Sequence, residues 1–72
     1  MSLEHIKEYI KSNVGKSLSF RINGSRNQIE EFEGVIVETY NRVFLVKEIN
    51  TRSIKSFSYN DVLIKNLVIK GV

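Results

Sequence analysis

The feature that most constrains the fold is a change in the spacing of apolar residues at Gly15. Before Gly15, apolar residues recur every three or four positions, which places them along one face of a helix. After it, Leu18, Phe20 and Ile22 alternate with polar residues, which is typical of a strand with one buried face. The sequence therefore predicts one N-terminal helix and a β-rich remainder. The apolar positions of the helical stretch are Leu3, Ile6, Tyr9, Ile10 and Val14.

Residues at both ends of the helical stretch match the chemistry of helix termini. Ser2 can act as the N-cap, and Glu4 in the first turn suits the positive end of the helix dipole. Lys11 falls in the last turn, and Gly15 follows the end, where glycine commonly stops a helix. We therefore expect a helix over about residues 2–13.

The remaining chain holds further apolar stretches separated by turn residues. Asn23-Gly24 marks a tight turn after the first strand, because both residues accept the positive φ that such turns need. A long second strand is predicted from about Gln28 to Tyr40, in which Gly34 indicates a bulge or a sharp bend. The later elements are strands over 43–46, 54–59 and 67–70, and a helical turn over 60–63 that Asn60 or Asp61 can cap.

These elements predict a mainly β fold, in which an N-terminal α-helix precedes a five-stranded, strongly bent antiparallel SH3-like or Sm-like small barrel. We expect a single domain over residues 1–72, with the barrel over about 16–70. The runs Val35–Val37 and Val43–Val46 lack alternation, so both faces of those strands should be covered. The expected cover is the helix, packed on the outside of the barrel, or a second copy of the chain in a homodimer.

Length and composition exclude several classes of protein. The 72 residues include no Cys and one His, which excludes a disulfide framework, a thiolate metal site and a two-histidine site. No apolar run approaches the roughly 18 residues that a membrane span needs. The first residues lack the basic flank and the apolar stretch of a signal peptide. We expect a soluble, cytoplasmic protein without metal, cofactor or membrane partner.

The sequence does not favour an enzyme. Glu30, Glu31 and Glu33 form the one carboxylate cluster, and their place along a strand is more typical of a solvated face than of an acid–base pair. The chain has neither a glycine-rich phosphate loop nor a serine elbow between glycines. We therefore predict no catalytic residues, and a subunit or fragment of an enzyme is the least favoured reading.

The formal charge of +3 is distributed in three blocks. Residues 1–28 hold five cations and two carboxylates, residues 29–48 two cations and five carboxylates, and residues 49–72 four cations and one carboxylate. The blocks therefore carry +3, −3 and +3. Such a layout favours opposite charges on neighbouring strands, with patches that steer an acidic partner as the alternative.

Direct binding of nucleic acid is the alternative to a protein partner. Barrels that bind single strands combine basic residues with exposed aromatic rings. Tyr40, at a turn beside Arg42, and Tyr59 are the aromatic residues predicted to be exposed, whereas the four glutamates at positions 30–38 would repel phosphates. Phe32-x-Gly34 followed by Asn41 is superficially similar to the first motif of Sm proteins, but their second motif is absent.

Three stretches of the chain together resemble a known family. They are Asn23–Arg26, Gly34–Val46 and Ser56–Leu63. The most specific parts are a Glu-Thr-Tyr element followed by Val-Phe, and a Ser-Tyr-x-Asp-Val-Leu element. These stretches resemble the bacterial Veg family, and the resemblance extends from about Ile6 to Ile69.

The resemblance implies a small, non-enzymatic cytoplasmic protein of Gram-positive bacteria that stimulates biofilm formation. Family members are described as acting on transcriptional control of matrix genes by opposing a repressor. We therefore expect regulation of transcription through a protein partner such as a transcriptional regulator.

The chain departs from the family pattern at a few positions. Ser25 replaces a second glycine, and Asn27 and Gln28 follow Arg26 where the family has basic residues, which weakens the case for a nucleic-acid-binding loop. Asn41 and Phe57 stand where the family tends to have Pro and Tyr, and they keep the turn and the aromatic character.

Five residues have no clear structural duty in the predicted fold. Arginine and tyrosine dominate the energetics of protein interfaces, so we expect these residues to contact the partner. Turn or cross-strand packing is the competing explanation for each, and an ion pair between Glu38 and Arg42 is favoured over a binding role. The five are Arg26, Glu38, Tyr40, Arg42 and Tyr59.

Overall fold

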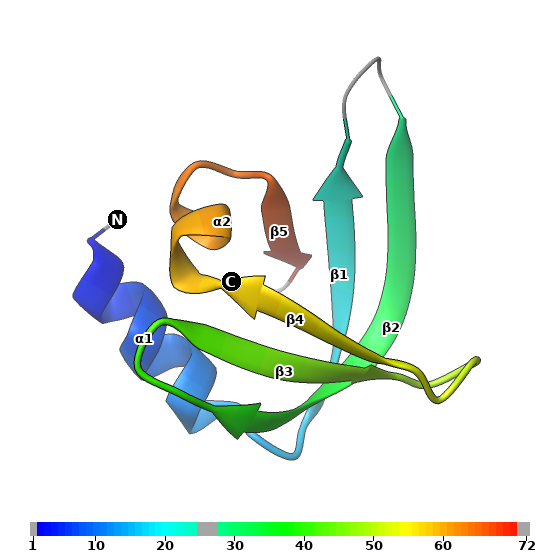
Figure 1. Cartoon of the computed structure of the whole chain (residues 1–72), viewed down its shortest axis with the longest axis horizontal. Coiled ribbons are helices and arrows are strands. Elements are labelled where there is room, and N and C mark those ends of the chain that lie inside the picture. The colour runs from blue at the N-terminus through cyan, green and yellow to red at the C-terminus, as the bar shows by residue number, and fades with distance from the viewer. Residues whose placement is uncertain (1, 25–27, 71–72) are drawn as a thin grey trace.

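The structure, a computed structural model, describes residues 2–24 and 28–70 (Figure 1). It confirms the predicted class, which is mainly β with an N-terminal helix and five antiparallel strands in one sheet. Among the described residues, no helix has the length and apolar character needed to cross a membrane. The elements are α1 (Leu3–Ser12), β1 (Ser17–Asn23), β2 (Ile29–Thr39), β3 (Val43–Glu48), β4 (Ile54–Ser58), α2 (Tyr59–Leu63) and β5 (Leu67–Lys70).

Helix α1 begins and ends as its sequence predicts. The Ser2 side chain accepts a hydrogen bond from the main-chain N–H of His5, and Gly15 has a φ of 86° just after the helix. Ile6 and Ile10 are buried in the same cluster as the apolar residues of the strands. The helix is therefore part of the one core, rather than a cover laid on the outside of the barrel as expected.

The sheet has the strand order β4-β3-β2-β1-β5, so β4 and β5 form its two edges. The first half of β2 pairs with β1, with Phe32 opposite Phe20, and its second half pairs with β3, with Glu38 opposite Leu45. Figure 1 shows β2 curving between these two pairings. This strongly bent sheet is compatible with the expected small barrel.

Gly34 permits a close approach of chains within the sheet. A Cβ atom at this position would lie 2.6 Å from Val46 Cγ1 and 3.0 Å from the Lys47 carbonyl oxygen. The register of β2 against β3 shifts between Ile36 and Glu38 instead. The bulge, one of the two possibilities predicted at Gly34, therefore lies further along β2. The other possibility, a sharp bend, is compatible with the structure, because Gly34 lies where the pairing of β2 passes from β1 to β3 and β2 curves there (Figure 1).

Aromatic rings run through the core from one end of the sheet to the other. The ring centroids of Phe20 and Phe32 are 5.3 Å apart, and those of Phe44 and Tyr59 are 5.5 Å apart, with Phe57 packed between these two pairs. Full burial of one such side chain stabilises a fold by about 1.5–3 kcal/mol. The buried residues are Ile6, Ile10, Phe20, Phe32, Ile36, Phe44, Val46, Tyr59, Leu67 and Ile69.

The outer face of β2 and β3 is only partly covered. Val37 is 40% exposed, and Val35, Val43 and Leu45 are half-buried. The expectation that both faces of these strands are covered therefore fails at Val37 within a single chain. A homodimer that would cover this face stays a prediction.

Helix α2 turns the chain from β4 toward β5. Its N-cap is Ser58, whose side chain accepts from the Asp61 N–H, while the Asp61 carboxylate accepts from the Ser58 N–H. The N-cap, predicted at Asn60 or Asp61, is thus Ser58, and Asp61 takes part in the capping box as its third helical residue. Since the capping box starts at Ser58, Tyr59 begins a helix rather than ending a strand.

Candidate functional site

A shallow hollow of about 350 Å³ lies where three elements meet at the helical end of the molecule. The start of α1, the turn between β2 and β3, and the start of α2 form its walls. We call it the α-end hollow. Its lining residues are Leu3, Lys7, Asn41, Arg42, Ser58, Tyr59 and Asn60.

The turn beside the hollow is tied to α2 by the main chain and by one buried side chain. The Tyr59 hydroxyl donates to the Tyr40 carbonyl over 2.7 Å, and the Tyr59 N–H donates to the Arg42 carbonyl over 3.2 Å. The Tyr40 N–H donates to the Val43 carbonyl and closes the turn. Three residues that the sequence singled out are therefore joined in one hydrogen-bonded unit.

Tyr59 is part of the scaffold of this site. It is 1% exposed, and burial raises the pKa of its hydroxyl. The predicted exposure of Tyr59 was wrong, because the step from strand to helix after Ser58 turns its ring against Phe44. Its ring can hold other residues of the site, but it offers little surface to a partner.

Two cations stand at the α-end hollow without a countercharge among the described residues. Lys7 Nζ lies 5.6 Å from the centroid of the Tyr59 ring, a distance suited to a cation–π contact. Arg42 is exposed. Neither residue forms a salt bridge in residues 2–24 and 28–70, and no carboxylate lines the hollow. The hollow therefore presents uncompensated positive charge beside an apolar floor.

Tyr40 and Glu38 lie together beside this hollow. Tyr40 is 49% exposed, and a hydrogen bond with the Glu38 carboxylate raises the pKa of the Tyr40 hydroxyl. The ion pair predicted between Glu38 and Arg42 does not form, because the carboxylate takes the phenol as its neighbour. Arg26, the fifth predicted contact residue, lies outside the described residues.

Sequence reasoning missed most of the residues that line the hollow. Leu3 and Lys7 belong to α1, where a spacing of four places them on the same side of the helix. That spacing is a signal in the sequence, but it does not reveal that the turn after β2 packs beside them. The other missed lining residues are Asn41, Ser58 and Asn60.

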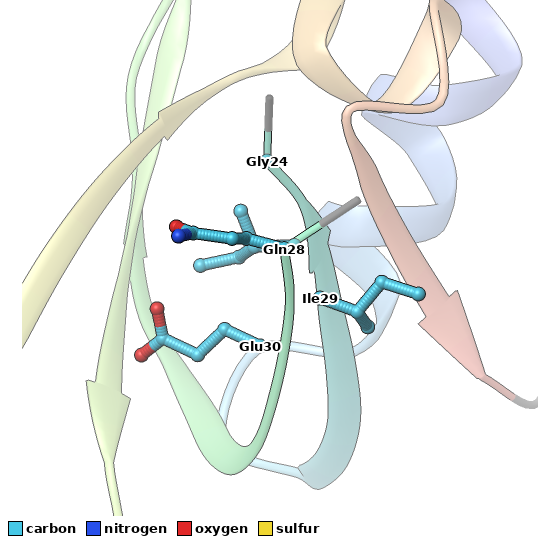
Figure 2. Close-up of a pocket in the computed structure, with 5 residues that line it drawn as sticks. Gly24, Gln28, Ile29 and Glu30 are labelled. Atoms are coloured by element: carbon cyan, nitrogen blue, oxygen red, sulfur yellow. The ribbon is translucent and has the colours of Figure 1, made fainter. Parts of the chain in front are cut away.

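A second hollow lies at the tip of the hairpin formed by β1 and β2. Figure 2 shows Gln28 and Glu30 extending to one side of β2 and Ile29 to the other. Glu30 lies 3.9 Å from Lys55 Nζ, which in turn stands 5.5 Å over the Phe32 ring. The charge at this hollow is thus already paired within the chain.

A second ion pair lies near the same end of the sheet. Lys70 hydrogen-bonds the Glu31 carboxylate, and this contact lowers the pKa of Glu31. No group of three or more His, Cys, Asp or Glu residues that could hold a metal ion occurs in the part of the chain that the structure describes. Glu30 and Glu31 of β2 therefore pair with lysines of β4 and β5, which are not the neighbours of β2 in the sheet. The opposite charges predicted on neighbouring strands occur at Arg21 and Glu31, which lie opposite each other in β1 and β2.

The chain is similar to a known protein family. A family model described as "Biofilm formation stimulator VEG" matches residues 1–70. No curated protein matches the chain.

Proposed function

Because the chain belongs to the Veg family of biofilm formation stimulators, we propose that it is a non-enzymatic cytoplasmic regulator that binds a protein partner through the α-end hollow and Tyr40. The partner we propose is a regulator of transcription, such as a repressor. Binding of this chain would then oppose the repressor, and biofilm formation would be stimulated.

The observation that carries this proposal is the grouping, on a hydrogen-bonded turn, of an exposed tyrosine and two cations that form no salt bridge in the described part of the chain. Tyr40 and Arg42 flank one tight turn, and Lys7 approaches from α1 across the Tyr59 ring. Tyrosine and arginine are the residues that most often dominate protein interfaces. Since the turn is already held by Tyr59, a partner would lose little free energy in ordering it.

Direct nucleic-acid binding is the second candidate, and one observation favours it. Exposed Tyr40 next to Arg42 combines a ring for base stacking with a cation for phosphate. Glu38 opposes it, because its carboxylate lies beside the Tyr40 hydroxyl. A mobility-shift series with single-stranded and duplex DNA and RNA separates the candidates: no binding at low salt eliminates this one, and affinity that falls steeply with salt supports it.

Site-specific photo-crosslinking in cells tests the protein-binding proposal. A photoreactive phenylalanine derivative is placed at Tyr40, and a matched control carries it at Ile29 on the hairpin, which is 53% exposed. We expect a protein adduct from position 40 that disappears with Arg42→Glu, and no such adduct from position 29. The same adducts from both positions, or an adduct at position 40 that persists with Arg42→Glu, would contradict the proposal.

A further inference from the structure

We infer that the α-end hollow binds an acidic peptide segment in which a carboxylate is next to a large apolar side chain. In this arrangement Lys7 and Arg42 bind the carboxylate, and Leu3 receives the apolar side chain. The inference rests on the proposed protein-binding function and names the chemistry of the partner.

Charge is the first argument for an acidic ligand. The two ion-paired lysines of the described residues, Lys55 and Lys70, neutralise Glu30 and Glu31 at the hairpin end. Within residues 2–24 and 28–70, Lys7 and Arg42 form no salt bridge, and no carboxylate lines the hollow between them. A ligand carboxylate would therefore complement the hollow and would displace no internal partner.

The position of the two cations is the second argument. Lys7 is half-buried and stands over the Tyr59 ring, while the main chain of Arg42 is held by the Tyr59 N–H. The Lys7 ammonium group and the backbone that carries Arg42 thus both depend on the same buried tyrosine. Asn41 and Asn60 add amide groups that can donate to a carboxylate or to a peptide carbonyl.

The apolar part of the hollow is the third argument. Leu3 is 40% exposed and lines the hollow together with Tyr59, although it belongs to the apolar stripe of α1. The volume of the hollow, about 350 Å³, is large enough for one carboxylate and one apolar side chain of a ligand. An apolar ligand side chain beside the carboxylate would bury the exposed part of Leu3.

A peptide fits this surface better than a nucleic-acid strand does. A strand carries a phosphate at each nucleotide and is bound by a longer groove of cations. Two cations line this hollow, Lys7 and Arg42, which is enough for a single carboxylate but short of a groove that follows successive phosphates.

The test is a titration of the ¹⁵N-labelled full chain with two pools of acetylated, amidated hexapeptides. One pool has Leu-Asp or Leu-Glu at its centre, and the matched pool has Leu-Asn or Leu-Gln. We expect the acidic pool to shift the amide signals of Lys7, Asn41, Arg42 and Asn60, with at least tenfold weaker binding of the amide pool. Lys7→Gln and Arg42→Gln should each weaken the binding of the acidic pool at least fivefold, and K55Q/K70Q should leave this binding unchanged.

Equal binding of the two pools, or acidic binding that survives both glutamine variants, would overturn the inference. Tighter binding of an octathymidine strand than of the acidic pool at the same signals would overturn it in favour of nucleic acid. The spectra of the variants away from the hollow show that the fold is kept. If the position 40 adduct forms as expected while the two pools bind alike, the protein-binding function stands and the carboxylate chemistry fails.

Discussion

The two ends of the molecule treat charge in opposite ways. At the hairpin end, Glu30 is paired with Lys55 and Glu31 with Lys70. At the helical end, Lys7 and Arg42 stand at a hollow that no carboxylate lines, while Tyr59 beneath them is buried and hydrogen-bonded. Two lysines of the hairpin end are thus paired with carboxylates of the sheet, whereas Lys7 and Arg42, which form no salt bridge among the described residues, are the cations that we propose for partner binding.

This difference separates structural from functional surface in a chain where charge alone is uninformative. Exposed salt bridges stabilise a fold only weakly, so we expect the hairpin pairs to add little to the stability of the sheet. Lys7 and Arg42 form no salt bridge among the described residues, and the buried Tyr59 beneath them holds the neighbouring turn through two hydrogen bonds. This contrast supports our proposal that the helical end binds the partner.

The largest expected effect comes from removing the scaffold of the helical end. Tyr59→Ala deletes a fully buried ring and should cost about 3–5 kcal/mol of unfolding free energy. Tyr59→Phe should cost only about 1 kcal/mol, the value of one hydrogen bond. Urea unfolding measures both, and a loss of less than about 1 kcal/mol for the alanine variant would contradict the role of Tyr59 as scaffold.

The next effect falls at the junction of the two ends. Gly34→Ala places a Cβ atom against Val46 Cγ1 and the Lys47 carbonyl, and overpacking of this kind costs about 1–3 kcal/mol. Gly34→Ala should cost less in a Val46→Ala background than in the wild-type chain, because the closest atom is then absent. In a double-mutant cycle of unfolding free energies, strict additivity would show that the two residues do not compete for space.

A smaller effect sharpens the description of the hairpin end. Lys70→Gln should raise the pKa of Glu31 toward its ordinary value of 4.5, because the hydrogen bond with Lys70 is what lowers it. With Lys70 present, the folded chain favours the charged form of the Glu31 carboxylate. The pairing with Lys70 therefore stabilises the fold above about pH 4.5, and this stabilisation is lost as the pH falls through the lowered pKa. A carbon-detected NMR titration of Glu31 measures the change in pKa. The same pKa with and without Lys70 would contradict the pairing of Glu31 with Lys70.

The smallest effect concerns Tyr40, at the border of the binding surface. Glu38→Gln should lower the pKa of Tyr40 toward its ordinary value of 10.0, since the Glu38 carboxylate is the main cause of the increase. The raised pKa of Tyr59 comes from burial and should stay as it is. NMR titration of the tyrosine rings in alkali measures the pKa of Tyr40 and that of Tyr59 separately. Equal changes in both pKa values on Glu38→Gln would argue against a local contact between Glu38 and Tyr40.

Local patterns predicted most of the fold, and contacts between distant elements account for what was missed. The spacing before and after Gly15 predicted α1 and the strands, because apolar periodicity follows local geometry. Nothing local indicates that β3 approaches Gly34, or that the ring of Tyr59 packs against Phe44 and is buried. The site was predicted in part for the same reason: Tyr40 and Arg42 flank a recognisable turn, whereas Lys7 joins them only through tertiary packing.

The most direct test of the assignment compares the two ends in living cells. A strain that lacks the protein is complemented with K7Q/R42Q, which neutralises the helical end, or with the matched K55Q/K70Q, which neutralises the hairpin end, at equal protein levels. We predict that K7Q/R42Q fails to restore biofilm mass and that K55Q/K70Q restores it. Full restoration by K7Q/R42Q, or failure of K55Q/K70Q alone, would contradict the account.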